Sequence, residues 1–169
     1  MTMAEGRIMA PGYTLIIGDK NFSSWSLRPW IAMKRFGIPF AEERIRLRQP
    51  ESRSAILCHS PSGKVPALKT NGLVVCDSLA ILEYLADKVG RERFWPKDDV
   101  ARGMARAMAA EMHSGFLPLR RECPMNLRKT YEGMTISEET RNDALRILGL
   151  WAEARARFGK EGPYLFGTY

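Results

Sequence analysis

The sequence is poor in the residues that build disulfide frameworks and histidine metal sites. It has three cysteines among 169 residues, they are widely separated, and none belongs to a Cys-X-X-Cys pair. This usage is typical of a reducing compartment, so we expect a cytoplasmic protein without a disulfide scaffold. Only two histidines are present, His59 and His113. A histidine-rich metal site is therefore not available, and we expect no bound metal.

Long hydrophobic runs are also missing. No apolar run approaches the roughly 20 residues that a membrane-spanning helix needs. Residues 1–12 lack the apolar stretch of a signal peptide. We therefore expect no membrane partner and interpret residues 1–12 as a flexible N-terminal tail.

Positive charge exceeds negative charge, with 26 Lys and Arg against 19 Asp and Glu and a net charge of +7. A basic surface can bind nucleic acid. The arginines are spread along the chain and are not massed in one run, so we favour an ordinary solvated surface and expect no nucleic-acid partner. Nucleic-acid binding stays as an alternative that depends on net charge alone.

Residues 13–90 alternate strand and helix signals. "YTLIIG" has the length of a buried strand, and "AEERIRLR" alternates apolar and charged residues. Asn71-Gly72, between two short apolar runs, is a strong hairpin signal. The expected elements are a strand over 13–18, a helix over 26–36, a strand over 41–48, a loop region, a hairpin over 64–77 and a helix over 77–90. This order predicts an α/β domain with a mixed four-stranded sheet, because the first two strands can pair in parallel and a hairpin is antiparallel.

The two helices of this part have recognisable boundaries. Pro29 favours a start of the first helix near Ser26, since proline fits the first turn and not later. The second helix is capped by Asp77 or Ser78 and ends at Gly90. Its predicted apolar side consists of Leu79, Leu82 and Leu85.

Only helix signals remain after a proline-containing linker over residues 91–97, so residues 98–169 are predicted to form an all-α domain. A second-domain helix begins after the capping residue Ser137 and ends at Gly159. Its predicted buried side consists of Ala144, Leu148, Trp151 and Phe158. An earlier helix has an apolar residue at every fourth position, namely Val100, Met104, Met108, Met112 and Phe116.

The segment "NFSSWS" places Ser23, Ser24 and Ser26 at a helix start. The unpaired N–H groups and the helix dipole there favour an anion and lower the pKa of a thiol. The alternative is a plain helix cap, which is the usual role of serine at this position. No Gly-X-Ser-X-Gly motif surrounds these serines, so a serine hydrolase is not favoured.

Two further segments carry binding-site features. In "SGKVPAL", a cis Val65–Pro66 bond would turn the backbone of Val65 outward, where it can pair with an extended peptide. The alternative is an ordinary turn before an edge strand. Asp77 and Ser78 stand at a helix N-terminus, where they either cap the helix or help to hold a carboxylate and an amine. Together the three segments suit a short peptide that carries a thiol and a carboxylate.

The segments "SSWSLRPW", "SGKVPAL" and "DSLAILEYLAD", in this order and spacing, resemble those of cytosolic glutathione S-transferases, most of all bacterial members near the zeta class. "EMHSGF", residues 111–116, resembles the helix that faces the active site in related bacterial proteins. The resemblance covers residues 13–169. It implies a thioredoxin-like N-terminal domain over 13–90, a helical glutathione-transferase C-terminal domain over 98–169, a homodimer, and glutathione as co-substrate.

The resemblance also implies roles for single residues. Ser23 would donate a hydrogen bond to the glutathione thiolate, with Ser24 as the alternative, and the thiolate would attack a small electrophile. The glutathione-binding residues that it implies are Lys64, Val65, Pro66, Asp77 and Ser78. The residues that it implies at the electrophile pocket are Trp25, Met112, His113 and Phe116.

Departures from the family pattern keep a second hypothesis open. Trp25 stands where the zeta pattern has a cysteine, and the sequence stops at Tyr169, where family members continue through a further buried helix. The predicted helical domain is then incomplete at its C-terminus. The second hypothesis is a non-catalytic member of the fold that binds glutathione or a protein. Ser23 and Ser26 have the spacing of a thioredoxin Cys-X-X-Cys with oxygen in place of sulfur, so we expect thiolate activation and no thiol–disulfide exchange.

Overall fold

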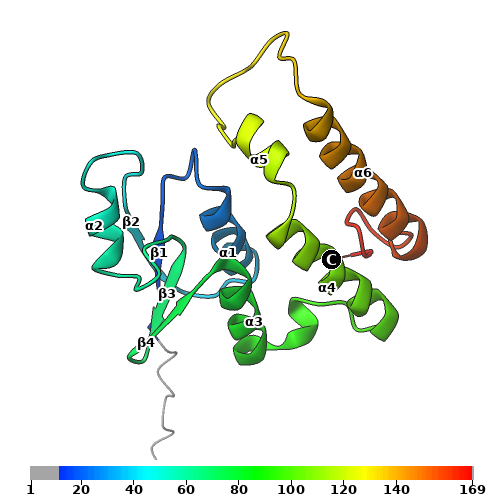
Figure 1. Cartoon of the computed structure of the whole chain (residues 1–169). Helices are drawn as coiled ribbons and strands as arrows, with labels where there is room; N and C mark the ends of the chain where they lie inside the picture. Colours follow the sequence, from blue (N-terminus) through cyan, green and yellow to red (C-terminus); the bar gives the residue numbers. More distant parts are fainter. Residues whose placement is uncertain (1–11, 169) are drawn as a thin grey trace, which may run out of the picture. The chain divides into compact units, whose positions relative to one another are not determined.

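The computed structural model describes residues 12–168, and residues 1–11 of the predicted tail lie outside them. The chain divides into two compact units, one ending at Tyr84 and the other beginning at Leu85 (Figure 1). The elements that lie wholly in the first unit are β1 (Thr14–Ile17), α1 (Ser24–Arg35), β2 (Ala41–Arg44), α2 (Ser52–Leu57), β3 (Ala67–Thr70) and β4 (Leu73–Cys76). The helix α3 (Ser78–Val89) spans the division. The second unit holds η1 (Arg91–Arg93), α4 (Asp99–Ser114), α5 (Leu117–Glu122) and α6 (Glu138–Phe158).

The first unit contains the mixed four-stranded sheet that the sequence predicts. Its strand order is β2-β1-β3-β4, with β1 and β2 parallel and the other neighbours antiparallel. The connection from β1 to β2 runs through α1, as a parallel pair requires. Asn71 and Gly72 both have positive φ, 43° and 77°, which is the backbone of the two-residue hairpin turn that favours Asn-Gly.

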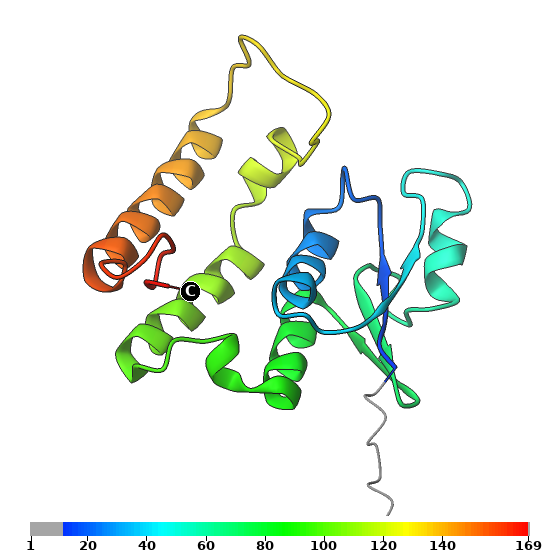
Figure 2. The same ribbon diagram turned by 180° about the vertical axis from the view of Figure 1, so that it is seen from behind.

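Both faces of the sheet are covered. The helix α2 lies on one face and α1 on the other, as Figures 1 and 2 show from opposite sides. On the α2 face the buried cluster consists of Ile16, Ile45, Ile56 and Ala67. On the α1 face, alternate strand residues are fully buried, namely Leu15, Ile17 and Leu68. Successive residues of β1 therefore face two different cores, which is why Leu15, Ile16 and Ile17 are all apolar.

The start of α1 differs from the prediction. The helix begins at Ser24, two residues earlier than Ser26, and Pro29 lies inside it. The reason is the cap: the Ser23 hydroxyl accepts a hydrogen bond from the Ser26 N–H at 3.2 Å. This bond fixes the helix start even though Pro29 has no N–H of its own to donate.

The segment predicted as a loop region contains the short helix α2. Its six residues are too few to show an apolar period, and only Ile56 is buried. The strand predicted over 41–48 ends at Arg44 as a regular element. The hydrogen bond from the Ile45 N–H to the Ile17 carbonyl, at 2.9 Å, still continues its pairing by one residue.

The buried side of α3 is also rotated from the prediction. Leu85 is buried as expected, but Leu79 and Leu82 are only half-buried. Ser78 and Ile81 take the inner positions instead, with 1% and 0% of their surface exposed. Three leucines at every third position drift around a helix of 3.6 residues per turn, so they cannot all face the same core.

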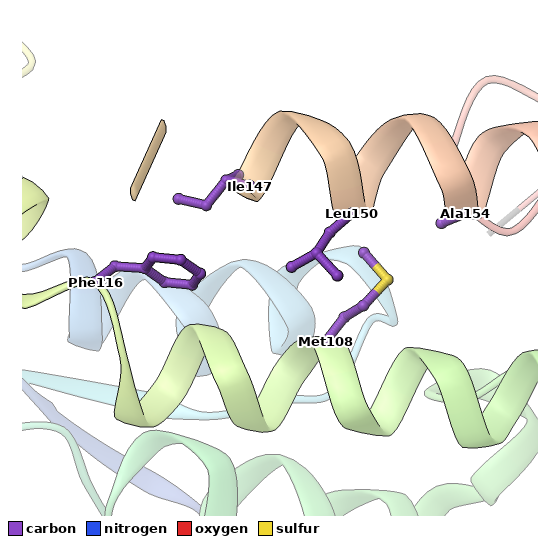
Figure 3. Close-up of a cluster of buried hydrophobic side chains, with 5 residues drawn as sticks. All are labelled: Met108, Phe116, Ile147, Leu150 and Ala154. Atoms are coloured by element: carbon purple, nitrogen blue, oxygen red, sulfur yellow. The ribbon is translucent and has the colours of Figure 1, made fainter. Parts of the chain in front are cut away.

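The second unit packs α4 against α6. Met108 of α4 and Phe116 meet Ile147, Leu150 and Ala154 of α6 in one buried cluster (Figure 3). At the surface of the same helix pair, the Arg146 guanidinium donates two hydrogen bonds to the Glu111 carboxylate, at 2.7 and 2.9 Å. No helix within residues 12–168 is long and apolar enough to cross a membrane.

The predicted buried side of α6 is wrong. Leu148 and Trp151 are 56% and 46% exposed, and Ala144 and Phe158 are half-buried. The core positions are Ile147, Leu150 and Ala154, spaced as one helix face. The helix is apolar on two faces, and the prediction followed the face that carries the large side chains of Leu148 and Trp151, which is the exposed one. In the predicted stripe along α4, Val100 is likewise exposed, and the alanines Ala101 and Ala105 are buried beside Met108.

Candidate functional site

The register of the sheet brings the three predicted segments of the first unit to one end of it. Ile16 of β1 pairs with Ala67 of β3, and Ala67 pairs with Cys76 of β4. Because β3 is antiparallel to both neighbours, the end of β1, the start of β3 and the end of β4 lie together. The segments at this end are the loop that leads to Ser23, the residues Lys64–Pro66 and the pair Asp77–Ser78.

Ser23 and Ser26 form a buried hydroxyl pair at the start of α1. The Ser23 hydroxyl donates to Ser26 Oγ at 2.9 Å, and the Gly18 N–H donates to the same oxygen at 3.0 Å. Gly18 packs so closely that a Cβ there would lie 2.6 Å from Leu47 Cδ1. The loop is closed by the Asp19 carbonyl, which accepts the Ser23 N–H at 2.8 Å. Ser23 is thus held in place from both sides, and the capping role considered from the sequence is real.

Ser24 and Trp25 lie in the first turn of α1 and are half-buried. The Arg28 guanidinium lies over the Trp25 ring, 4.3 Å from its centre. Arg28 also donates a weak hydrogen bond, at 3.5 Å, to the Ser78 hydroxyl. Arg28 therefore connects α1 with the start of α3. No local pattern in the sequence indicated this contact, because the two residues are 50 positions apart.

Val65 and Pro66 are joined by a cis peptide bond, as the sequence reasoning anticipated. Pro66 is buried, Val65 is half-buried and Lys64 is exposed. Within residues 12–168, neither the N–H nor the C=O of Val65 has a backbone partner. A donor and an acceptor on one residue just before a strand are what an extended peptide needs for pairing at that end of the sheet.

Asp77 and Ser78 begin α3. Asp77 has a left-handed backbone with φ of 83°, and its carboxylate accepts hydrogen bonds from the N–H groups of Leu79 at 2.8 Å and Ala80 at 3.4 Å. Asp77 is therefore the helix cap. Its charge nevertheless lies at the exposed end of the sheet, next to the buried hydroxyl of Ser78.

The other predicted pocket residues belong to the second unit. Met112 and His113 are half-buried near the end of α4, and Phe116 is 8% exposed in the core cluster. The Met112 carbonyl accepts a hydrogen bond from Arg120, which also lies 3.7 Å from the Met112 sulfur. No group of three or more His, Cys, Asp or Glu residues in the described part of the chain could hold a metal ion.

Known proteins resemble this chain in sequence and in fold. Residues 22–88 match the model of the glutathione S-transferase N-terminal domain. Glutathione S-transferase theta-1 of Rattus norvegicus is 34% identical over 119 residues, which are 69% of this chain and 48% of that protein. A probable maleylacetoacetate isomerase of Caenorhabditis elegans is 33% identical over 100 residues, 59% of this chain and 46% of that protein. The chain spans about half the length of these curated relatives.

Solved structures support the fold. Glutathione S-transferase unclassified 2 from Bombyx mori aligns with a TM-score of 0.70 and 23% identity, covering 94% of this chain and 71% of that one. A theta class glutathione S-transferase from Xanthomonas axonopodis pv. citri, solved with glutathione bound, aligns with a TM-score of 0.65 and 22% identity, covering 94% and 75%. The fold is thus a thioredoxin-like unit followed by a helical unit, and the chain belongs to the glutathione S-transferase family.

Proposed function

We propose that the chain is a glutathione-dependent transferase in which a serine hydroxyl stabilises the glutathione thiolate for attack on a small electrophile. The observation that carries the proposal is the gathering of three segments at one end of the sheet. These segments supply a hydroxyl at a helix start, an unpaired backbone N–H and C=O, and an acidic residue at a second helix start. Glutathione carries a thiol, an extended peptide and a charged amino-acid end, so each segment has a matching group.

The backbone of glutathione pairs with Val65 in this proposal. The N–H and C=O of Val65 add the cysteinyl residue to the sheet end as a short strand. Pro66 donates no hydrogen bond and leaves this role to Val65. Lys64, exposed next to them, attracts the glycyl carboxylate.

The γ-glutamyl end lies at the start of α3. The Asp77 carboxylate attracts its ammonium group, and the N-terminus of α3 and the Ser78 hydroxyl favour its carboxylate. Arg28 donates to the same hydroxyl and adds positive charge beside it. This assignment gives Asp77 two roles, because its carboxylate also caps the helix.

Ser23 donates to the thiolate after one change in its hydrogen bonds. In the structure its proton is directed to Ser26 Oγ. A hydroxyl is both a donor and an acceptor, so Ser26 can donate to Ser23 while still accepting the Gly18 N–H. The Ser23 proton is then available for sulfur. Ser24, half-buried in the first turn, is the alternative donor.

The electrophile is defined only by class. The relatives named glutathione S-transferase and maleylacetoacetate isomerase favour a small electrophile or an isomerisable unsaturated acid. Trp25, half-buried in the first turn of α1, is proposed to contact it. We further propose a cytoplasmic location, since three separated cysteines fit a reducing compartment. The proposed homodimer rests on the family resemblance alone.

The test is calorimetric binding of glutathione to the wild type, Ser23→Ala and Ser24→Ala, with thiolate absorbance followed against pH in the same samples. One hydrogen bond to a charged group is worth about 1.5–3 kcal/mol, so its loss should raise the pKa of the bound thiol by about 1–2 units. We expect this rise in Ser23→Ala and not in Ser24→Ala, with binding retained in both.

Other outcomes decide between the alternatives. A rise in Ser24→Ala alone would assign the thiolate to Ser24. Binding with an ordinary thiol pKa in all three proteins would support the non-catalytic hypothesis. Failure of the wild type to bind glutathione would overturn the proposal.

A further inference from the structure

Three charged or titratable side chains lie on the α2 face of the sheet, away from the proposed glutathione segments. They are Glu43 of β2, Lys69 of β3 and His59, which follows α2. Glu43 pairs with Ile16 and Lys69 pairs with Thr14, two residues apart on the central strand β1, so both side chains point to the same face. Two strand spacings separate them, about 10 Å, and the imidazole ring of His59 fills this gap.

The hydrogen bonds of this triad fix the proton positions on the imidazole. Lys69 Nζ lies 2.9 Å from His59 Nδ1, and His59 Nε2 lies 3.0 Å from Glu43 Oε1. An ammonium group only donates, so Nδ1 accepts and the ring proton is on Nε2. That proton is donated to Glu43. Lys69 as nucleophile, His59 as base and Glu43 as the group that orients the base are therefore joined by hydrogen bonds in sequence. Enzymes that activate a nucleophile through an adjacent base use the same arrangement.

The surroundings of Lys69 differ from those of other lysines in the same unit. Lys20 and Lys34 both form ion pairs with the Glu42 carboxylate, at 2.6 and 3.6 Å. Lys69 faces a neutral nitrogen that can take a proton. His59 is 22% exposed and Lys69 is half-buried, so a small reagent can reach the amine.

We propose that Lys69 is a site of covalent acylation by small acyl thioesters, with His59 as the general base and Glu43 as a positioning residue for the imidazole. His59 Nδ1 takes a proton from the Lys69 ammonium group. The neutral amine then attacks the thioester carbonyl, a C–N bond forms and the C–S bond breaks. The leaving thiolate takes the proton from His59, and the second amine proton passes to water. The products are an amide and a thiol, and no oxidant or reductant is needed.

The test exposes the folded chain to S-acetyl-N-acetylcysteamine and follows acetylation of each lysine by peptide mass spectrometry. Lys20 and Lys34 are internal controls, because their side chains are 50% and 52% exposed. If exposure alone governed the reaction, these two would be modified first. We expect Lys69 to be modified faster than either.

Variants identify the base. General-base catalysis contributes typically about 10²–10⁴-fold, and for a partly exposed pair we expect the lower end. His59→Gln keeps a hydrogen-bonding side chain without a base, so the ratio of Lys69 to Lys20 acetylation should fall by about 10²-fold. Glu43→Gln should lower this ratio less than His59→Gln does, and Glu43→Asp should stay nearer the wild type because it keeps the carboxylate.

The far-ultraviolet circular dichroism spectrum should be the same in all variants, which verifies that the unit stays folded. The proposal is overturned if Lys69 is modified no faster than Lys20 and Lys34 in the wild type. It is also overturned if His59→Gln leaves the ratio of Lys69 to Lys20 unchanged.

Discussion

Replacing the three serines at the start of α1 one at a time should separate their structural roles. Ser26 Oγ accepts the buried Gly18 N–H and the Ser23 hydroxyl, at 3.0 and 2.9 Å. Ser23 Oγ accepts the Ser26 N–H at 3.2 Å and caps the helix. Ser24 is half-buried in the first turn. The structure thus assigns the largest loss of stability to Ser26→Ala and the smallest to Ser24→Ala.

The magnitudes follow from the bonds lost. Ser26→Ala leaves the Gly18 N–H buried without its acceptor, which costs about 1–3 kcal/mol. Ser23→Ala removes the cap, which costs about 1 kcal/mol. Ser24→Ala should stay within about 0.5 kcal/mol, because alanine is a good helix former and no buried partner is left behind.

Urea unfolding followed by far-ultraviolet circular dichroism measures these differences, with Ser24→Ala as the matched control. The order Ser26, Ser23, Ser24 in loss of unfolding free energy is the expected result. Equal losses for Ser24→Ala and Ser26→Ala would refute the hydroxyl pair as a structural unit. Such a result would also remove the hydrogen-bond reversal by which Ser23 is proposed to reach the thiolate.

Three further changes test other parts of the structure. In urea titrations, Leu150→Ala should lower the unfolding free energy by about 2–4 kcal/mol, because Leu150 is buried. Leu148→Ala, at an exposed position of the same helix, should change it by less than about 0.5 kcal/mol. The reverse order would contradict the assignment of the buried face of α6. Arg146 holds the pKa of Glu111 below its ordinary value through hydrogen bonds, so this pair stabilises the fold above the ordinary carboxyl pKa and ceases to do so as the pH falls through the lowered one. Glu111→Gln should therefore melt below the wild type at neutral pH and converge with it in acid, and a difference independent of pH would contradict the pairing. Gly72→Val should cost about 1–2 kcal/mol from backbone conformation alone, because φ is 77° and a Cβ there meets nothing within 4 Å; a thermal midpoint equal to that of the wild type would count against the left-handed turn.

Local chemistry explains what the sequence predicted well. Asn71-Gly72 is specific for one turn type, and Leu15–Ile17 is an unbroken apolar run, so the hairpin and the buried strand were both predicted correctly. The cis bond at Pro66 was anticipated because proline alone makes this geometry accessible. The order of the elements then determined the mixed sheet.

The sequence predictions failed where tertiary packing decides which helix face is buried or which distant residues come into contact. The helix α6 has apolar residues on two faces, and only the packing of Ile147 and Leu150 on α4 selects one of them. The contact of Arg28 with Ser78 joins residues 50 positions apart, which no local pattern encodes. The same is true of Lys69, His59 and Glu43, which come from three elements and become neighbours only when the sheet has formed.

The hydroxyl pair at the start of α1 has no oxidised form. Two cysteines at the positions of Ser23 and Ser26 would form or lose a disulfide bond as the thiol–disulfide balance of their surroundings changed, and the shape of the loop would change with it. Two serines joined by a hydrogen bond of 2.9 Å keep the same geometry at any such balance. The loop after β1 therefore behaves as a fixed support under oxidative stress, the condition in which the supply of reduced thiols changes most.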